Sequence, residues 1–257
     1  MKILFLGDIV GRPGRTAVKE RLGRLREEHG LDMVVANGEN ASGGLGLSSK
    51  VARELLGAGI DVLTSGNHIW KFREVYNFLT TEPRLLRPDN FPQGVPGRGF
   101  GVFEMDSVRV AVVNLQGRTF MQPVDCPFKA ADRILADLKG RAEVILVDFH
   151  AEATSEKTAM AWHLEGRVSV LVGTHTHIQT SDARVLPGGT GYITDLGMCG
   201  PVDSCLGMKS QPILDRFLSG LPTRFEVAGG RVAIQGVVAE VDETTGRARS
   251  MELLDLS

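Results

Sequence analysis

The sequence predicts an α/β protein: one domain with two sheets and helices on the outside. Near-continuous apolar runs such as KILFL (Lys2–Leu6) are typical of strands buried on both faces. Segments with helical spacing of apolar residues alternate with these runs, which predicts a β-α-β-α-β-α order and a parallel sheet. The C-terminal stretch instead alternates in the manner of antiparallel strands, which indicates the second sheet.

The N-terminal part is expected to hold three strands, each ending in polar residues. The helix after the first strand is predicted from Arg15 to His29, because Val18, Leu22 and Leu25 recur at helical spacing. The expected order is the strand KILFL, the loop GDIVGRPGR, this helix, the strand DMVVANGEN, a helix capped by Ser48 or Ser49 and running to Leu56, and the strand DVLTSGNH.

The middle of the chain has a different character. Arg84 to Gly101 is rich in Pro, Gly and Arg, which predicts a long surface loop, and GVFEMDSVRVAVVNLQG predicts a hairpin that turns near Asp106. The remaining expected elements are the helix CPFKAADRILADLKG, the strand AEVILVDFH, the helix SEKTAMAWHLEG, the strand RVSVLVGTHTH, and antiparallel strands in TRFEVAGGRVAIQGVVAEVDETTGRARSMELLDL. No linker or internal repeat interrupts residues 1–257, so we expect a single domain.

Composition excludes several classes of protein. Hydrophobic residues make up 42% and charged residues 23% of the 257 residues, as in globular proteins. A formal net charge of −2 argues against stable binding to long nucleic acid. No stretch is apolar for the roughly 18 residues that a membrane helix needs. Three cysteines without C-x-x-C spacing fit a reducing cytoplasm. A homo-oligomer is left open, with the hairpin at Asp106 and the C-terminal strands as contact surfaces.

Polar residues gather at the carboxyl ends of five predicted strands. In open α/β sheets, ligands bind beyond these ends, so the side chains should converge. A helix cap explains an Asp or Asn there, and a single His is more often a buried polar group than a ligand. The joint pattern is harder to explain in that way, because four of the six histidines follow strands: His68, His150, His175 and His177.

The donor set fits metal ions. Carboxylate, amide carbonyl and imidazole suit Fe, Mn or Zn. A single catalytic ion usually takes three protein ligands, so six or seven donors predict two ions, roughly 3.5–4 Å apart. His175 and His177 would face the same side of an extended segment, His150 adds a third imidazole, and Glu39 has two oxygens for a bridge.

The charges point to an anionic substrate. Two divalent ions bring four positive charges, of which Asp8 and Glu39 cancel two and a bridging hydroxide one more. The site stays positive, as a phosphate ester requires. The neutral amides of Asn40 and Asn67 bind metal without reducing that charge, which leaves His68 free to act on the substrate.

These motifs resemble those of the calcineurin-like metallophosphoesterases, which carry D-x-H, G-D-x-x-D, G-N-H-[DE], a single His and G-H-x-H at strand ends. The chain has Gly7-Asp8, Asn37-Gly38-Glu39-Asn40, Gly66-Asn67-His68, His150 and Gly173-Thr174-His175-Thr176-His177. It departs from the pattern at Val10, Glu39, Ile69 and Thr174. FLGDIVGRPGR, NGENASGGLG, SGNHIW, DFHAEATSEK, VGTHTH and TDLGMCGP are similar to the bacterial YmdB-type branch along nearly the whole chain.

The resemblance implies an α/β/β/α sandwich and a two-metal phosphodiesterase acting on 2′,3′-cyclic AMP and related diesters. Carried over by position, one ion would be held by Asp8, Glu39, Asn40 and His177, and the other by Glu39, Asn67, His150 and His175. His68 would be the proton donor. Fe or Mn is the expected metal, with Zn an alternative.

The resulting hypothesis is hydrolysis by a metal-bridging hydroxide, with His68 protonating the leaving oxygen. A phosphomonoesterase or protein phosphatase on the same site remains an alternative, because the His of D-x-H is absent. A non-catalytic nucleotide sensor is a rival of another class, and a di-metal amidohydrolase is a weaker one. The roles of Arg12, Arg15 and the Gly43–Gly46 loop stay open.

Overall fold

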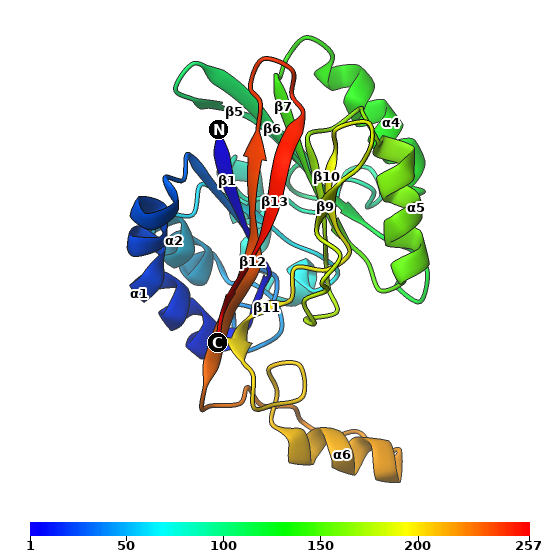
Figure 1. Cartoon of the computed structure of the whole chain (residues 1–257). Helices are drawn as coiled ribbons and strands as arrows, with labels where there is room; N and C mark the ends of the chain where they lie inside the picture. The colour runs from blue at the N-terminus through cyan, green and yellow to red at the C-terminus, as the bar shows by residue number, and fades with distance from the viewer.

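Two mixed sheets lie face to face between two layers of helices in the computed structural model, which describes residues 1–257. Figure 1 shows helices α1 and α2 on one side of the molecule and α4 and α5 on the other. The arrangement is therefore the α/β/β/α sandwich that the resemblance implied.

The first sheet has seven strands, in the order β2, β11, β12, β1, β3, β4, with β13 paired to β12. As predicted, the N-terminal strands run parallel: β1 pairs with β3, and β3 with β4. On its other side β1 pairs antiparallel with β12, so the sheet is mixed. The bounds are β1 Lys2–Leu6, β2 Asp8–Ile9, β3 Met33–Asn37, β4 Val62–Thr64, β11 Met198–Pro201, β12 Val232–Val241 and β13 Ala248–Leu256.

The second sheet has six strands, in the order β5, β6, β7, β8, β10, β9. The expected hairpin is present, because β5 and β6 pair antiparallel around Asp106, whose φ is 54°. Strands β6, β7 and β8 are parallel neighbours. The bounds are β5 Phe100–Met105, β6 Val108–Gln116, β7 Val144–His150, β8 Val170–Thr174, β9 Arg184–Val185 and β10 Gly191–Ile193.

The helices are α1 Gly11–His29, α2 Ser49–Gly57, α3 Val75–Thr81, α4 Pro127–Leu138, α5 Thr154–Leu164 and α6 Ser210–Ser219, with a 3₁₀ turn at Ile69–Lys71. Of the two predicted caps, Ser48 and Ser49, it is Ser48 that caps α2 by accepting from the N–H of Val51. Helix α1 begins at Gly11 rather than at Arg15, because Pro13 is tolerated in the first turn, where its missing N–H would have no partner within the helix. None of the helices combines the length and the hydropathy that a bilayer-spanning segment requires.

Three apolar clusters fill the spaces between the layers. One lies between the first sheet and α1 and α2, one between the two sheets, and one between the second sheet and α4 and α5. The inter-sheet cluster takes alternate residues from both sheets, such as Ile3 and Phe5 from β1 and Val110 and Val112 from β6. This packing fixes how the strand ends of the two sheets meet.

Two expectations for irregular segments were wrong in part. The Arg84–Gly101 segment is largely without regular structure, but Leu85, Leu86 and Arg87 are buried, so it is not a surface loop throughout. In the C-terminal stretch, TRFEV forms only an isolated bridge between Val227 and Met208. The antiparallel pair is β12 with β13, joined through Thr245-Gly246.

Candidate metal centre

The eight side chains predicted from the strand ends meet at one edge of the sandwich. The first sheet supplies Asp8 from β2, Glu39 and Asn40 after β3, and Asn67 and His68 after β4. The second sheet supplies His150 at the end of β7, and His175 and His177 after β8. The centre is therefore formed between two sheets, and neither sheet alone contains it.

Glu39, His150 and His175 form the tightest group, with one ligand atom from each lying within 4.8 Å of the others. Nε2 of His150 is 3.1 Å from Oε1 of Glu39 and 3.0 Å from Nδ1 of His175. It is also 3.1 Å from Oδ1 of Asn67. Two imidazoles, a carboxylate and an amide oxygen thus surround one point.

A second group lies on the other side of Glu39. Nδ2 of Asn40 is 3.1 Å from Nε2 of His177 and 3.4 Å from Oδ1 of Asp8. Nε2 of His177 is 3.7 Å from Oδ1 of Asp8. Asn40 also lies 3.4 Å from Oε1 of Glu39, which joins the two groups.

His68 is placed differently from the other three histidines. Its Nδ1 is 2.9 Å from Oδ1 of Asn40 and 3.0 Å from Oε1 of Glu39. Its side chain is 33% exposed, whereas that of His150 is fully buried. The ring is thus oriented through one nitrogen while its other edge borders solvent.

The buried carboxylates set the ionisation of the cluster. Burial disfavours the imidazolium of His150, but the adjacent Glu39 carboxylate outweighs this and raises the pKa of His150 to about 9. Burial likewise opposes the charge on Glu39, yet His150 and His68 hold its pKa well below the usual range. A metal ion that binds the His150 nitrogen must therefore displace a proton.

Burial also shifts two further groups. It lowers the pKa of His175 to about 3, with the positive charge of His150 adding to the effect. It raises the pKa of Asp8, although His177 and His150 oppose the rise. His175 is consequently a neutral imidazole at physiological pH, which is the form that binds metal.

Asp148 is not one of the candidate ligands, but it supports the metal centre through hydrogen bonds. This fully buried carboxylate accepts hydrogen bonds from Nδ2 of Asn37 at 3.1 Å and from Oγ1 of Thr174 at 2.7 Å, and also from Oγ1 of Thr64. The Thr174 hydroxyl is in turn 2.9 Å from Nδ1 of His150. Burial raises the pKa of Asp148 to about 6. The carboxylate therefore orients His150 through Thr174 rather than by direct contact, a common arrangement around metal-binding histidines.

An internal ion pair holds the loop of His175 and His177, and sequence reasoning missed it. Nζ of Lys157 on α5 is 2.7 Å from Oδ2 of Asp195, and both side chains are 1% exposed. Asp195 also accepts from the N–H groups of Thr176 and Gly197. The signal available was Lys157 on the inner face of a predicted helix.

The expected extended geometry of His175 and His177 was wrong. Their φ angles are 103° and 64°, so the segment after β8 turns sharply instead of alternating. The two imidazoles still reach the two groups, because the N–H of His175 donates to Asp8 and Nδ1 of His177 lies 3.0 Å from the carbonyl of Leu206. Tertiary contacts, rather than strand periodicity, place them.

The sequence left open the roles of Arg12, Arg15 and the Gly43–Gly46 loop, and the surroundings of these residues are mainly structural. The Arg15 guanidinium donates to the carbonyl of Ala41 and pairs with Glu54 at 3.5 Å. Arg12 is exposed on α1. In the Gly43–Gly46 loop, a Cβ at Gly44 would lie 2.4 Å from Met208 and one at Gly46 would lie 2.5 Å from Lys71. These glycines allow close packing around Glu39 and Asn40.

The donor set fits the metal ions that the resemblance implies. Two buried carboxylates and three imidazoles lie together with amide oxygens, and the centre contains no thiolate. This is the chemistry of Fe, Mn and Zn sites. Gly66 makes room for it, since a Cβ there would lie 2.2 Å from the His150 ring and 2.4 Å from Oε2 of Glu39.

Comparison with known proteins places the chain in a family. The family model described as YmdB-like protein matches residues 4–254. The chain belongs to the YmdB-like family. This family is part of the metallophosphoesterase superfamily. A relative from Bacillus subtilis (strain 168), named 2′,3′-cyclic-nucleotide 2′-phosphodiesterase, is 48% identical over 98% of this chain and 96% of its own length. A Mycoplasma pneumoniae relative, named putative phosphatase/phosphodiesterase, is 35% identical over 99% of this chain and 92% of its own.

Solved structures agree with the fold. A hypothetical protein from Thermus thermophilus superimposes with a TM-score of 0.94 at 42% identity, covering 100% of this chain and 99% of the other. A putative 5′-nucleotidase from Staphylococcus aureus reaches a TM-score of 0.64 at 15% identity, covering 99% of this chain and 54% of the other. The second likeness concerns the fold alone.

Proposed function

We propose that the chain is a two-metal phosphodiesterase that hydrolyses small phosphodiesters such as 2′,3′-cyclic AMP. The chain is a phosphodiesterase of the hydrolase class, on the strength of its 48% identity to the Bacillus subtilis enzyme. The observation that carries the metal dependence is the cluster of Glu39, His150 and His175 within 4.8 Å. Fe or Mn is the proposed metal, and Zn also suits these ligands.

The two-ion count is supported by the division of the ligands into two groups around Glu39. Asp8, Asn40 and His177 would hold one ion, Asn67, His150 and His175 would hold the other, and Glu39 would contribute to both. Bound ions would lower the pKa of water and offset charge on the phosphoryl oxygens. Asp8 and Glu39 are the only carboxylates among these ligands, so the loaded centre keeps a positive charge that attracts a phosphodiester anion.

His68 is proposed as the proton donor to the leaving oxygen. Its Nδ1 is held by Asn40 and Glu39, and its partly exposed ring leaves the other nitrogen available to a substrate. A general acid in this position contributes roughly 100- to 10,000-fold to the rate. Its loss should therefore lower turnover without removing a metal ligand.

The decisive experiment compares His68→Ala with His150→Ala in metal content and in turnover of 2′,3′-cyclic AMP and bis-p-nitrophenyl phosphate. We expect about two ions per chain in the wild type and in His68→Ala, with activity lost in the variant. His150→Ala should lose at least one ion. A fully metallated and active His150→Ala protein would rule out the two-ion proposal, and loss of metal from His68→Ala would rule out its role as proton donor.

A phosphomonoesterase on the same centre is the second candidate. The name of the Mycoplasma pneumoniae relative includes phosphatase activity. Assay of p-nitrophenyl phosphate beside the diester distinguishes the two reactions, and we expect the diester to be preferred. Nucleotide binding without turnover of either ester, in metal-loaded protein, would instead support the sensor.

A further inference from the structure

A two-residue hairpin turn lies beside the metal centre and contacts one of its proposed ligands. The turn spans Cys205–Met208, and the N–H of each of these two residues donates to the carbonyl of the other, at 2.8 and 3.0 Å. The two central residues, Leu206 and Gly207, have φ angles of 54° and 89°, as in a type I′ turn. The carbonyl oxygen of Leu206 lies 3.0 Å from Nδ1 of His177.

This contact decides which nitrogen of His177 carries the proton of the neutral imidazole. A carbonyl oxygen only accepts hydrogen bonds, so Nδ1 must be the donor. The unprotonated nitrogen is then Nε2, which lies 3.1 Å from Nδ2 of Asn40 and 3.7 Å from Oδ1 of Asp8. Because a metal ion binds the unprotonated nitrogen, the contact directs the ligand atom of His177 toward the other proposed ligands of the same ion.

Only one imidazole, that of His177, is proposed for the ion on its side of Glu39. The other ion would have two, from His150 and His175. The D-x-H motif of the metallophosphoesterases would place a second imidazole on the His177 side, but this chain has Val10 at that position. The orientation of a single ring therefore decides whether the ion on this side has a nitrogen ligand at all.

The turn holds Leu206 in a conformation that a leucine rarely adopts. A positive φ is strained for residues other than glycine, and asparagine or glycine is the usual choice at the first central position of a type I′ turn. The Leu206 side chain is 45% exposed, so burial offsets little of that strain. A strained residue persists only where the surrounding structure fixes it. The neighbours of the turn must therefore hold it in place.

Hydrogen bonds and close packing supply that support. The hydroxyl of Ser204 accepts from the N–H of Gly207 at 2.8 Å and donates at 2.6 Å to the carbonyl of Pro201, the last residue of β11. The carbonyl of Gly207 accepts from the N–H of Ala228 at 2.9 Å. Gly207 also packs so closely that a Cβ there would lie 2.6 Å from Cγ1 of Val10. The Ser204 hydroxyl is thus the side-chain group that ties the turn to the first sheet.

We propose that the Cys205–Met208 turn is a positioning element for His177. The main-chain carbonyl of Leu206 fixes the imidazole, and the Ser204 hydroxyl fixes the turn. The inference rests on the metal centre of the proposed function, and it assigns no contact with the substrate to these residues. Loosening the turn should weaken the binding of one of the two ions and leave the other in place, because His150 and His175 have other partners.

Removal of metal by a competing chelator tests the proposal on the full, metal-loaded chain. Ser204→Ala should weaken the binding of one ion by about tenfold, since losing a group that orients a metal-binding histidine typically costs about 10- to 100-fold in affinity. Ser204→Thr keeps the hydroxyl and should bind both ions as the wild type does. Ser219→Ala is the matched control, because the Ser219 hydroxyl also donates to a carbonyl at 2.6 Å and accepts from an N–H at 3.2 Å, but at the end of α6. It should leave both affinities unchanged.

Leu206→Asn separates the main chain from the side chain. Asparagine adopts a positive φ more readily than leucine and leaves the carbonyl in place. The variant should therefore keep both ions, and the Tm of its metal-free form should rise. Thermal unfolding of the metal-free Ser204→Ala protein checks the fold, because a merely structural serine would lower the Tm without changing the affinity for metal.

Equal metal affinities in Ser204→Ala and Ser219→Ala would overturn the role of the turn. Equal weakening of both ions in Ser204→Ala would overturn it as well, because the Leu206 carbonyl contacts a ligand of one ion only. Loss of an ion from Leu206→Asn would overturn the assignment to the main chain. A wild-type protein that binds no metal would instead overturn the proposed function itself, so the two failures are distinguishable.

Discussion

Replacing Lys157 with methionine tests how much the internal ion pair contributes to the fold and to the metal centre. Methionine keeps most of the length of the side chain but removes its charge. The ammonium of Lys157 lies 2.7 Å from Asp195, and both side chains are 1% exposed. The variant therefore leaves a buried carboxylate without its counter-ion.

The expected cost follows from the contacts that remain. Breaking a buried ion pair on one side costs about 3–5 kcal/mol. Asp195 keeps two hydrogen bonds from the N–H groups of Thr176 and Gly197, so we place the loss of unfolding free energy at about 3 kcal/mol. For a chain of this size that lowers Tm by about 6–12 °C.

The assay is urea unfolding together with metal analysis. Because Asp195 holds the N–H of Thr176, between two proposed ligands, Lys157→Met should also reduce metal content. Adding Asp195→Asn should restore part of the stability, since the uncompensated charge is then absent. Arg231→Met is the matched control, because Arg231 and Asp203 form an exposed pair whose side chains are 63% and 60% exposed; its effect should stay below about 1 kcal/mol. Equal stabilities of Lys157→Met and Arg231→Met would refute the reasoning.

Three positions in or near the centre give further predictions. Gly66→Ala places a Cβ 2.2 Å from the His150 ring and should abolish metal binding, as measured by elemental analysis. Gly57→Ala is the control, because a Cβ at that position has no atom within 4 Å, and it should leave metal binding unchanged. Thr174→Val removes the hydroxyl between Asp148 and His150 and should weaken metal affinity by about 10- to 100-fold in chelator competition; an unchanged affinity would exclude this positioning role. Burial raises the pKa of the Cys199 thiol to about 12, so only Cys126 and Cys205 should react with a thiol reagent in the folded protein. In the unfolded chain the Cys199 thiol loses its proton from its ordinary pKa of 9.0 upward, whereas the folded protein retains that proton. The unfolding free energy of the wild type should therefore fall as pH rises above that value, and that of Cys199→Ala should fall less steeply. Parallel curves of unfolding free energy against pH for the two proteins would contradict this.

The local elements were largely readable from the sequence. Apolar runs indicated the buried strands, Ser48 indicated the start of α2, and the polar strand ends indicated every residue of the candidate centre. These signals are readable because a strand buried on both faces is apolar along its length and becomes polar only at its end, where the candidate ligands lie. Periodicity failed where the backbone left regular geometry, at His175 and His177.

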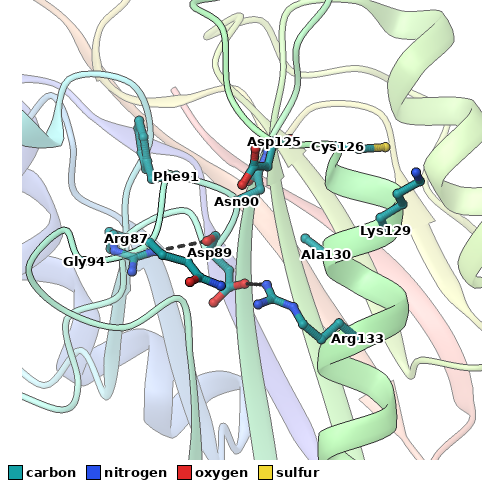
Figure 2. A pocket seen from close by; sticks show the side chains of 11 residues that line it. Arg87, Asp89, Asn90, Phe91, Gly94, Asp125, Cys126, Lys129, Ala130 and Arg133 are labelled. Atoms are coloured by element: carbon teal, nitrogen blue, oxygen red, sulfur yellow. Dashed lines mark hydrogen bonds and ion pairs between the residues drawn. The ribbon is translucent and has the colours of Figure 1, made fainter.

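Contacts between distant segments were beyond the sequence. Nothing in the local pattern pairs Lys157 with Asp195 or directs Asp148 to Thr174, because each residue is compatible with an ordinary surface or strand-end role. A cavity beside α4 (Figure 2) likewise arises from two segments that are far apart along the chain, Arg87–Gly94 and Asp125–Arg133.

The sequence by itself determined the fold class, the two-sheet arrangement and the identities of the candidate ligands, since strand burial and strand-end polarity are local properties of the chain. Only the tertiary structure decided how those ligands divide around Glu39 and which carboxylates support them. These features depend on how two sheets pack face to face, because that packing brings Glu39 of one sheet within 3.1 Å of His150 of the other.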